Sequence, residues 1–258
     1  MTTTTASVTR QSELESLLYA FHLPSFTKNY QQYARQAEKE RLDHVGYLYQ
    51  LAKLESEDRY NRKTERLIRQ AKLLRGKTLD HFDLSKFTGI SESQIMELAE
   101  GSCLDRAENV LVFGNPGTGK THLAAALGRE WCLRGRRVLF TTASSLVQDL
   151  LAAKRDLKLN AMLKRLDRFD ALIIDDISYI PQDREETDVL FVLLSERYEQ
   201  RSLVITSNLP FSQWDKVFKD SVTTMAAIDR VVHHATVLEL NGESYRAQAA
   251  GRRNKRSS

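Results

Sequence analysis

The stretch that decides the fold is Gly114-Asn115-Pro116-Gly117-Thr118-Gly119-Lys120-Thr121, which fits the pattern G-x-x-x-x-G-K-[ST] at every fixed position. It follows the apolar run Asn109–Phe113 and precedes a helical pattern, HLAAALGREW. A strand, a glycine-rich loop and a helix in this order are the context in which such a loop binds phosphate. The backbone N–H groups of the loop turn inward, and the start of the helix adds the positive end of its dipole.

The loop therefore predicts a nucleotide site. Its expected members are Gly114, Asn115, Pro116, Gly117, Thr118, Gly119, Lys120, Thr121 and the next residue, His122. Lys120 is expected to neutralise the β- and γ-phosphates of a nucleotide, and the Thr121 hydroxyl is expected to bind Mg²⁺. The alternative is a glycine-rich turn that binds nothing, and the flanking strand and helix disfavour it.

Short apolar runs alternate with helical patterns from Arg106 onward. The runs predict five strands, at 109–113, 137–141, 171–175, 203–206 and 236–240. Helical segments are expected near 120–133, 144–166, 186–200 and 221–234. Buried strands that alternate with helices predict an α/β fold, with a parallel sheet covered by helices on both faces.

Polar side chains follow two of these strands. The apolar run 171–174 ends in Asp175 and Asp176, at the strand end where open α/β sheets bind ligands. Asp175 is expected to hold Mg²⁺ and Asp176 to orient the attacking water, although an acidic turn would look similar. Asn208 follows the next strand, where its amide could hydrogen-bond the γ-phosphate or the water. The strand at 137–141 precedes the acidic strand, which suits P-loop ATPases with a strand inserted between their two nucleotide-binding strands.

Residues 12–76 are expected to be helical because they are rich in strong helix formers and contain few glycines. The helical pattern at 47–75 is long, and a break is predicted around 56–58. The predicted organisation is a helical N-terminal DNA- or partner-binding domain (1–78), a connector (79–105), an ATPase domain (106–248) and a disordered basic tail (249–258).

Composition narrows the class of protein. The 258 residues include 41% hydrophobic and 28% charged residues, which excludes global disorder. No apolar stretch is long enough for a membrane span, and the N-terminus lacks the apolar segment of a secretion signal. The two cysteines, Cys103 and Cys132, are far apart and suit a reducing cytoplasm. We therefore expect a cytoplasmic protein without a membrane partner.

Charge is distributed unevenly along the chain. The net charge of +4 equals that of the last ten residues, which contain four basic side chains and no acid. Residues 59–77 contain eight basic residues and one acid, whereas 170–199 contain nine acids and two basic residues. Such asymmetry predicts an anionic partner on one surface and a cation or basic neighbour on another.

A basic stripe in the N-terminal region predicts contacts with DNA phosphates. Arg59, Arg62, Arg66 and Arg69 recur at helical spacing with Lys63 beside them, which gives a basic face of about 15 Å. A solvated helix face or a contact with an acidic protein is the alternative. No base-reading motif is present, so sequence-specific recognition is not expected.

Together, these motifs resemble the AAA+ ATPases of the initiator and helicase-loader clade. The residues that carry the resemblance are GNPGTGKT, LIIDD, ITSN, Ala227-Ile228-Asp229-Arg230 and Gly242-Glu243-Ser244-Tyr245-Arg246. The chain is most similar to the IstB-like helpers of insertion-sequence transposition and next to the DnaC-type loaders. Phe21-His22-Leu23-Pro24, Tyr30 and Tyr33 also look IstB-like, and the resemblance covers about 14–247.

The resemblance implies roles for matching positions. Lys120 and Thr121 would belong to Walker A, Asp175 and Asp176 to Walker B, Asn208 to sensor I, Arg230 to the arginine finger of a neighbouring subunit and Arg246 to sensor II. Arg230 could instead be a surface arginine paired with an acid, and Arg246 an ordinary basic residue at a chain end.

The sequence departs from the wider AAA+ pattern in two ways. Asp176 stands where most AAA+ proteins have Glu, so slow intrinsic hydrolysis is expected. Only 18 residues follow Leu240, so no C-terminal lid domain is expected. The IstB-like and DnaC-like proteins look similarly short.

The helical region at 144–166 supplies a second candidate DNA contact. It divides into about 144–158 and 159–166, although a plain ATPase core needs one helix there. The surplus resembles the initiator-specific insertion, whose basic residues here are Lys154, Arg155 and Lys158. The alternative is a helix pair used only in subunit packing.

The expected function is that of an ATP- and Mg²⁺-dependent AAA+ ATPase that binds double-stranded DNA with little sequence preference. It would form a homo-oligomer with ATP at subunit interfaces and assist a transposase. The main alternative is a replicative helicase loader. A P-loop kinase would need an acceptor pocket and a lid, for which the sequence offers no candidate.

Overall fold

The computed structural model describes residues 2–84, 90–179, 184–216 and 221–242. Arg246 and the basic tail at 249–258 lie outside the described residues. The chain divides into two compact units, Met1–Glu65 and Arg66–Ser258. No helix of the described part combines the length and apolarity needed to cross a bilayer.

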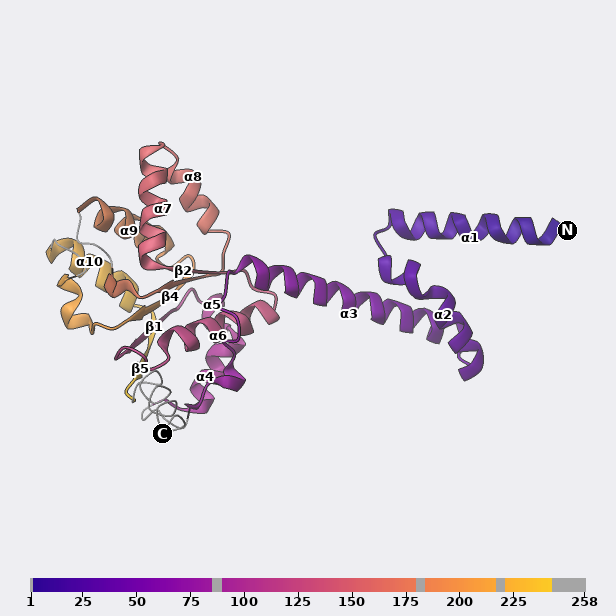
Figure 1. Ribbon diagram of the computed structural model, residues 1–258, viewed down its shortest axis with the longest axis horizontal. Helices are drawn as coiled ribbons and strands as arrows, with labels where there is room; N and C mark the ends of the chain where they lie inside the picture. The colour runs from indigo at the N-terminus through magenta and orange to yellow at the C-terminus, as the bar shows by residue number, and fades with distance from the viewer. Residues whose placement is uncertain (1, 85–89, 180–183, 217–220, 243–258) are drawn as a thin grey trace, which may run out of the picture. The chain divides into compact units, whose positions relative to one another are not determined.

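The first unit is helical, as the sequence predicts (Figure 1). It contains α1 (Thr2–Ala20), α2 (Pro24–Glu40) and the first part of α3 (His44–Gln70). Glu55 is buried on α3, where its carboxylate accepts hydrogen bonds from the Ser25 amide (2.9 Å) and from Arg59 Nε (2.7 Å). The expected break at 56–58 is wrong, because α3 continues through these residues.

The second unit is built on a five-stranded parallel sheet (Figure 1). Its strands are β1 (Asn109–Gly114), β2 (Val138–Thr142), β3 (Ala171–Asp175), β4 (Ser202–Ser207) and β5 (Ala235–Leu240). One face packs against α4 (Glu92–Glu100), α5 (Ser102–Asp105) and α6 (Lys120–Leu133). The other packs against α7 (Ala143–Arg155), α8 (Leu159–Leu166), α9 (Arg184–Arg197) and α10 (Ser221–Val232). The predicted α/β class and all five predicted strands are confirmed.

Strand order in the sheet is β2-β3-β4-β1-β5. A strand does lie between the phosphate-loop strand β1 and the acidic strand β3, but it is β4, whereas β2 lies at the edge. The prediction that the strand at 137–141 is the inserted one is wrong, because the order of strands along the chain does not determine their order in the sheet. The carboxyl ends of β1, β4 and β3 are consequently neighbours.

The sequence predicts a connector at 79–105, but described residues of this segment, at 79–84 and 90–105, contribute buried side chains to the ATPase core. Ile95 is 1% exposed, and the fully buried Trp131 of α6 donates its indole N–H to the Leu98 carbonyl at 2.7 Å. The boundary between the compact units lies at Glu65 and Arg66, within α3, and not at residue 78. The Ser and Asp content of this segment suggested a connector, but its apolar side chains pack into the core.

Candidate functional site

The glycine-rich loop joins β1 to α6 through backbone conformations that favour glycine. Gly114 has a φ of 152°, and a Cβ atom there would lie 2.6 Å from the Leu240 carbonyl oxygen and 2.9 Å from Thr118 Oγ1. Gly119, with a φ of 102°, precedes the first residue of α6. The loop is therefore wound tightly against β5 and ends in the first turn of the 14-residue helix α6.

Lys120 is held inside this loop. Its side-chain ammonium donates to the carbonyl oxygens of Gly114 (2.7 Å) and Asn115 (2.9 Å), and the residue is only 7% exposed. The buried Thr118 hydroxyl donates to the same Asn115 carbonyl at 2.9 Å. A cation held by two loop carbonyls at the start of a helix is suited to a polyphosphate ligand.

Oxygen ligands from three elements meet beside Lys120. The Asp175 carboxylate accepts hydrogen bonds from Thr121 Oγ1 at 3.2 Å and from Thr206 Oγ1 at 2.7 Å. Thr206, at the end of β4, also accepts the backbone N–H of Asp176 at 2.8 Å. Carboxylate and hydroxyl oxygens are ligands that Mg²⁺ prefers, so Thr121 and Asp175 fit the predicted metal site.

Asp176 and Asn208 face each other across β3 and β4. The side-chain Nδ2 of Asn208 donates to Asp176 Oδ1 at 3.1 Å, and the backbone N–H of Asn208 donates to Ser178 Oγ at 2.9 Å. Asp176 has a φ of 61°, in the left-handed region, which turns the chain out of the strand. Burial, together with the negative charge of Asp175, raises the pKa of the Asp176 carboxyl. This carboxylate is thus partly desolvated and oriented by an amide.

A pocket of about 400 Å³ joins these groups. It is lined by Leu74, Lys77, His81, Phe82, Pro116, Gly117, Gly119, Lys120, Thr121, His122, Asp176, Thr206 and Asn208. The sequence missed the four lining residues from 74–82 because that segment carries no motif. It missed Thr206 because this threonine was interpreted only as the last residue of the predicted strand 203–206.

Residues 74–82 form one wall of this pocket. The His122 ring contacts the Thr78 carbonyl oxygen at 2.9 Å and meets Phe82 edge to face, with 5.4 Å between ring centroids. Burial lowers the pKa of the His122 imidazole, which favours the neutral ring. Aromatic rings beside a phosphate loop offer apolar contacts for a nucleotide base.

Asp176 gives a prediction about pH. Because its pKa is higher in the folded chain than in the unfolded chain, its ionisation costs stability once the pH rises through the folded-state value. Asp176→Asn should therefore be more stable than wild type at pH 7, with a difference that shrinks as the pH is lowered through that value. The same variant should hydrolyse ATP about 100-fold more slowly, because it cannot accept a proton.

Urea unfolding at several pH values, together with phosphate release, would measure both effects. Asp149→Asn, at an exposed position on α7, is the control and should change neither. An Asp176→Asn protein that is less stable than wild type at pH 7 would contradict the burial argument.

Comparison with known proteins identifies the family. The family model for IstB-like ATP-binding proteins matches residues 16–253. The chain belongs to the IstB-like ATP-binding protein family. An insertion-sequence ATP-binding protein of Sinorhizobium fredii is 44% identical over 241 residues, which cover 93% of this chain and 81% of the relative. An ATP-binding protein of insertion sequence IS21 from Pseudomonas aeruginosa is 39% identical, over 91% of this chain and 88% of the relative.

Solved structures place this IstB-like protein in the AAA+ fold. AMPPCP-bound DnaA from Aquifex aeolicus matches with a TM-score of 0.55 and 20% identity, over 66% of this chain and 51% of that one. The DnaC helicase loader matches with a TM-score of 0.51 and 17% identity, over 64% of this chain and 97% of that one. The predicted AAA+ fold is confirmed, and the chain is an ATP-binding ATPase.

Arg230 lies outside the nucleotide pocket of its own chain. It is on α10, where its guanidinium stacks over the Phe191 ring of α9 at 5.0 Å from the ring centroid. Its Nη1 atom is buried without a hydrogen-bond partner in the described part of the chain. Among the described residues, no ion pair joins Arg230 to an acid; such a pair was the alternative to an arginine finger.

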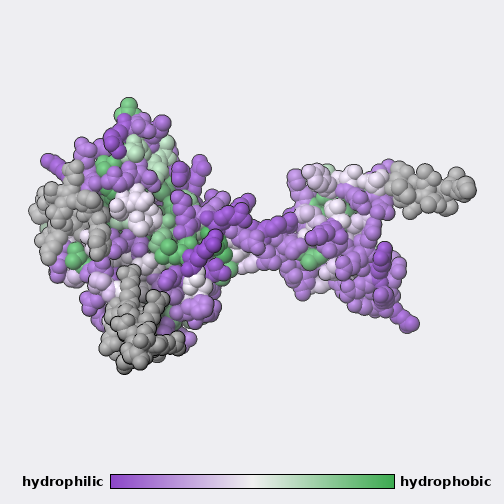
Figure 2. Space-filling model, viewed as in Figure 1, coloured by the Kyte–Doolittle hydropathy of each residue, from purple (hydrophilic) through white to green (hydrophobic). Residues whose placement is uncertain are grey.

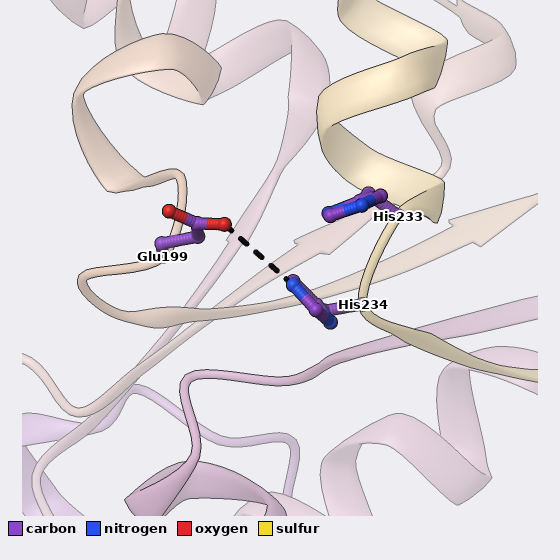
Figure 3. Close-up of side chains that lie close together, drawn as sticks. All are labelled: Glu199, His233 and His234. Carbon is purple, nitrogen blue, oxygen red and sulfur yellow. Dashed lines mark ion pairs between the residues drawn. The ribbon is translucent and has the colours of Figure 1, made fainter.

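A separate cluster brings together Glu199, His233 and His234 (Figure 3). His234 Nε2 lies 3.6 Å from Glu199 Oε1, and His233 Nδ1 lies 3.0 Å from the Tyr198 hydroxyl. The three side chains are exposed, and potential ligand atoms lie within 4.8 Å of one another. They lie at the amino ends of β4 and β5, whereas the phosphate loop follows the carboxyl end of β1, so they are no part of the nucleotide site.

Proposed function

We propose that this protein is an ATP- and Mg²⁺-dependent ATPase that assembles on double-stranded DNA with little sequence preference and assists a transposase in insertion-sequence transposition. The observation that carries the ATPase part is that Lys120, Thr121, Asp176 and Asn208 line one pocket, where Thr121 also donates a hydrogen bond to Asp175. The relatives named as insertion-sequence ATP-binding proteins support the link to transposition.

Each residue would act on a different part of ATP. Lys120 would stabilise negative charge on the β- and γ-phosphates, and Thr121 with Asp175 would hold Mg²⁺, which neutralises developing charge when bound. Asp176, oriented by Asn208, would accept the proton of the attacking water. Arg230 of a neighbouring subunit would stabilise the transition state, so hydrolysis would depend on assembly.

A basic pocket of about 460 Å³ in the second unit supports DNA binding. It is lined by Arg66, Leu67, Gln70, Lys72, Arg137, Leu139, Arg165, Arg168 and Phe169, which include five cations and no acid. Within the described residues, none of these cations forms an ion pair at 4.0 Å or less. Concentrated positive charge without internal partners suits a polyanion such as a phosphate backbone.

The walls of this basic pocket are held firmly. The Phe140 amide of edge strand β2 donates to the Ala71 carbonyl at 2.8 Å, which fixes the end of α3. The fully buried guanidinium of Arg197 donates to the Leu166 and Phe169 carbonyls, both at 3.0 Å. These bonds pin the turn that carries Arg168, so the cations need little ordering on binding.

Some of the basic side chains on α3 that are predicted to contact DNA already have hydrogen-bond partners within the first unit. Arg59 donates to Glu55 and to the His22 carbonyl, and Arg62 donates to Glu55 at 3.1 Å. These two guanidinium groups stabilise the first unit, so we expect them to contribute less to DNA binding than Arg66. Lys63 and Arg69 are exposed on α3, as are Lys154, Arg155 and Lys158 at the α7–α8 turn, and all five remain candidate contacts.

Size measurement on DNA would test the proposal. Wild-type protein mixed with duplex DNA of arbitrary sequence should form a larger complex with ATP than without it, and Lys120→Ala should not respond to ATP. Raising the salt from 50 to 200 mM should weaken the complex at least about 100-fold, because phosphate contacts release counterions. A complex whose size is unchanged by ATP would overturn the assembly mechanism. Co-purification with a replicative helicase instead of a transposase would favour a loader.

A further inference from the structure

The turn between α7 and α8 holds an apolar residue in an unusual backbone conformation. Leu157 has a φ of 57°, which is the left-handed region. Its amide donates to the Lys154 carbonyl at 3.1 Å, and the Lys158 amide donates to the Ala153 carbonyl at 2.7 Å. These two bonds form the Schellman motif that ends α7, and they leave Leu157 at the position where glycine is preferred.

The Leu157 side chain contributes nothing visible to the core. It is 95% exposed, the most exposed of the large hydrophobic side chains in the described part of the chain. The other described non-glycine residues with positive φ are charged, polar or small: His22, Arg41, Lys72, Ala107, Asp176 and Glu199. A leucine at this position has a strained backbone and an exposed apolar side chain, and neither feature stabilises the folded state.

The surroundings of Leu157 are basic. Lys154, Arg155 and Lys158 are exposed around it, with Asp156 as the one acid in this stretch. Hydrophobic atoms stand at the tip of the α7–α8 pair among hydrophilic ones (Figure 2). The eight residues of α8 then lead from this tip toward Arg165 and Arg168 of the basic pocket.

We propose that Leu157 is a wedge that inserts between neighbouring base pairs of duplex DNA, from the minor groove, while the surrounding cations hold the phosphates. The inference rests on the DNA binding proposed above. Proteins that bend DNA insert single leucine, isoleucine, methionine or phenylalanine side chains in this way, with basic residues alongside. Unstacking one base step would kink the duplex where the α7–α8 turn touches it.

The alternative occupant is another protein, and two observations disfavour it. Leu157 is the only exposed large hydrophobic side chain among the described residues 143–166, whereas a protein interface is built on a contiguous apolar patch. Three of the four residues that surround it in this stretch, Lys154, Arg155 and Lys158, are cations, which an interface core excludes and a phosphate backbone attracts.

The test uses the full-length protein and Leu157→Gly, which removes the wedge but suits the backbone. Because glycine adopts positive φ without strain, this variant should unfold about 2–4 °C higher than wild type. Loss of function in a more stable protein cannot be assigned to misfolding. Leu157→Met keeps an apolar wedge, and Met96→Ala removes an exposed apolar side chain of α4 as the matched control.

Duplex DNA with 2-aminopurine at successive positions reports base unstacking, and fluorescence anisotropy of the same duplexes reports binding. Wild type, Leu157→Met and Met96→Ala should raise 2-aminopurine fluorescence, whereas Leu157→Gly should not. Leu157→Gly should bind only about three- to tenfold more weakly, since phosphate contacts supply most of the affinity.

The outcomes separate the two proposals. Wild-type binding without a fluorescence change, or an equal change with Leu157→Gly, would overturn the wedge and leave DNA binding intact. Absence of wild-type binding would overturn both. An assembly defect of Leu157→Gly without DNA would assign the side chain to a protein contact and also overturn the wedge.

Discussion

Lys120→Ala is expected to reduce ATP hydrolysis by at least about 100-fold and to weaken ATP binding strongly, because the phosphates lose their only buried cation among the described lining residues. Lysine fits this place because its single ammonium reaches two loop carbonyls at 2.7 and 2.9 Å. A planar guanidinium has a different donor geometry, so Lys120→Arg should not restore activity.

Fluorescent ATP-analogue binding and phosphate release would measure these effects. Lys53→Ala, which removes an exposed lysine from a surface ion pair with Glu57, is the control and should behave like wild type. Circular dichroism should be unchanged for both variants. A Lys120→Ala protein that still hydrolyses ATP at the wild-type rate would show that the loop is not the catalytic phosphate site.

Arg230→Ala is expected to reduce DNA-stimulated hydrolysis by about 1,000-fold or more, since an arginine supplied by a neighbouring subunit has an effect of this size. ATP affinity should change less than about threefold, because Arg230 does not line the pocket of its own chain. Arg230 stacks on Phe191, and its Nη1 atom has no hydrogen-bond partner among the described residues, so Arg230→Ala removes no hydrogen bond of that atom within its own chain.

Steady-state kinetics of Arg230→Ala would separate binding from turnover. Arg201→Ala, at an exposed arginine 3.5 Å from Asp170, is the control and should retain activity. Equal losses of ATP affinity and of turnover in Arg230→Ala, accompanied by a lower unfolding temperature, would instead indicate that Arg230 has only a structural role.

The local parts of the site could be predicted from the sequence. The phosphate loop, Asp175, Asp176 and Asn208 each stand at the end of an apolar run, and the geometry of parallel sheets brings such ends together. The strand order and the unbroken α3 could not be predicted, because they depend on which surfaces pack together. Local propensity is weaker than tertiary packing at these places.

That residues 74–82 form a wall of the nucleotide pocket could not be predicted from the sequence for a related reason. Phe82 and Thr78 contact His122 although they lie about 40 positions away along the chain, and no sequence pattern predicts contacts at that separation. The basic pocket is similar: Arg66 belongs to a visible helical stripe, but Arg137 and Arg168 join it only through the fold.

The central claim is that ATP hydrolysis requires residues from two subunits, and mixing two inactive variants tests it most directly. Lys120→Ala lacks a working phosphate loop but keeps Arg230, whereas Arg230→Ala keeps the loop. Hydrolysis should therefore be restored on duplex DNA when the two proteins are combined, to a sizeable fraction of the wild-type rate. If the mixture is as inactive as its components although both variants are present in the same complexes on DNA, the shared site is wrong.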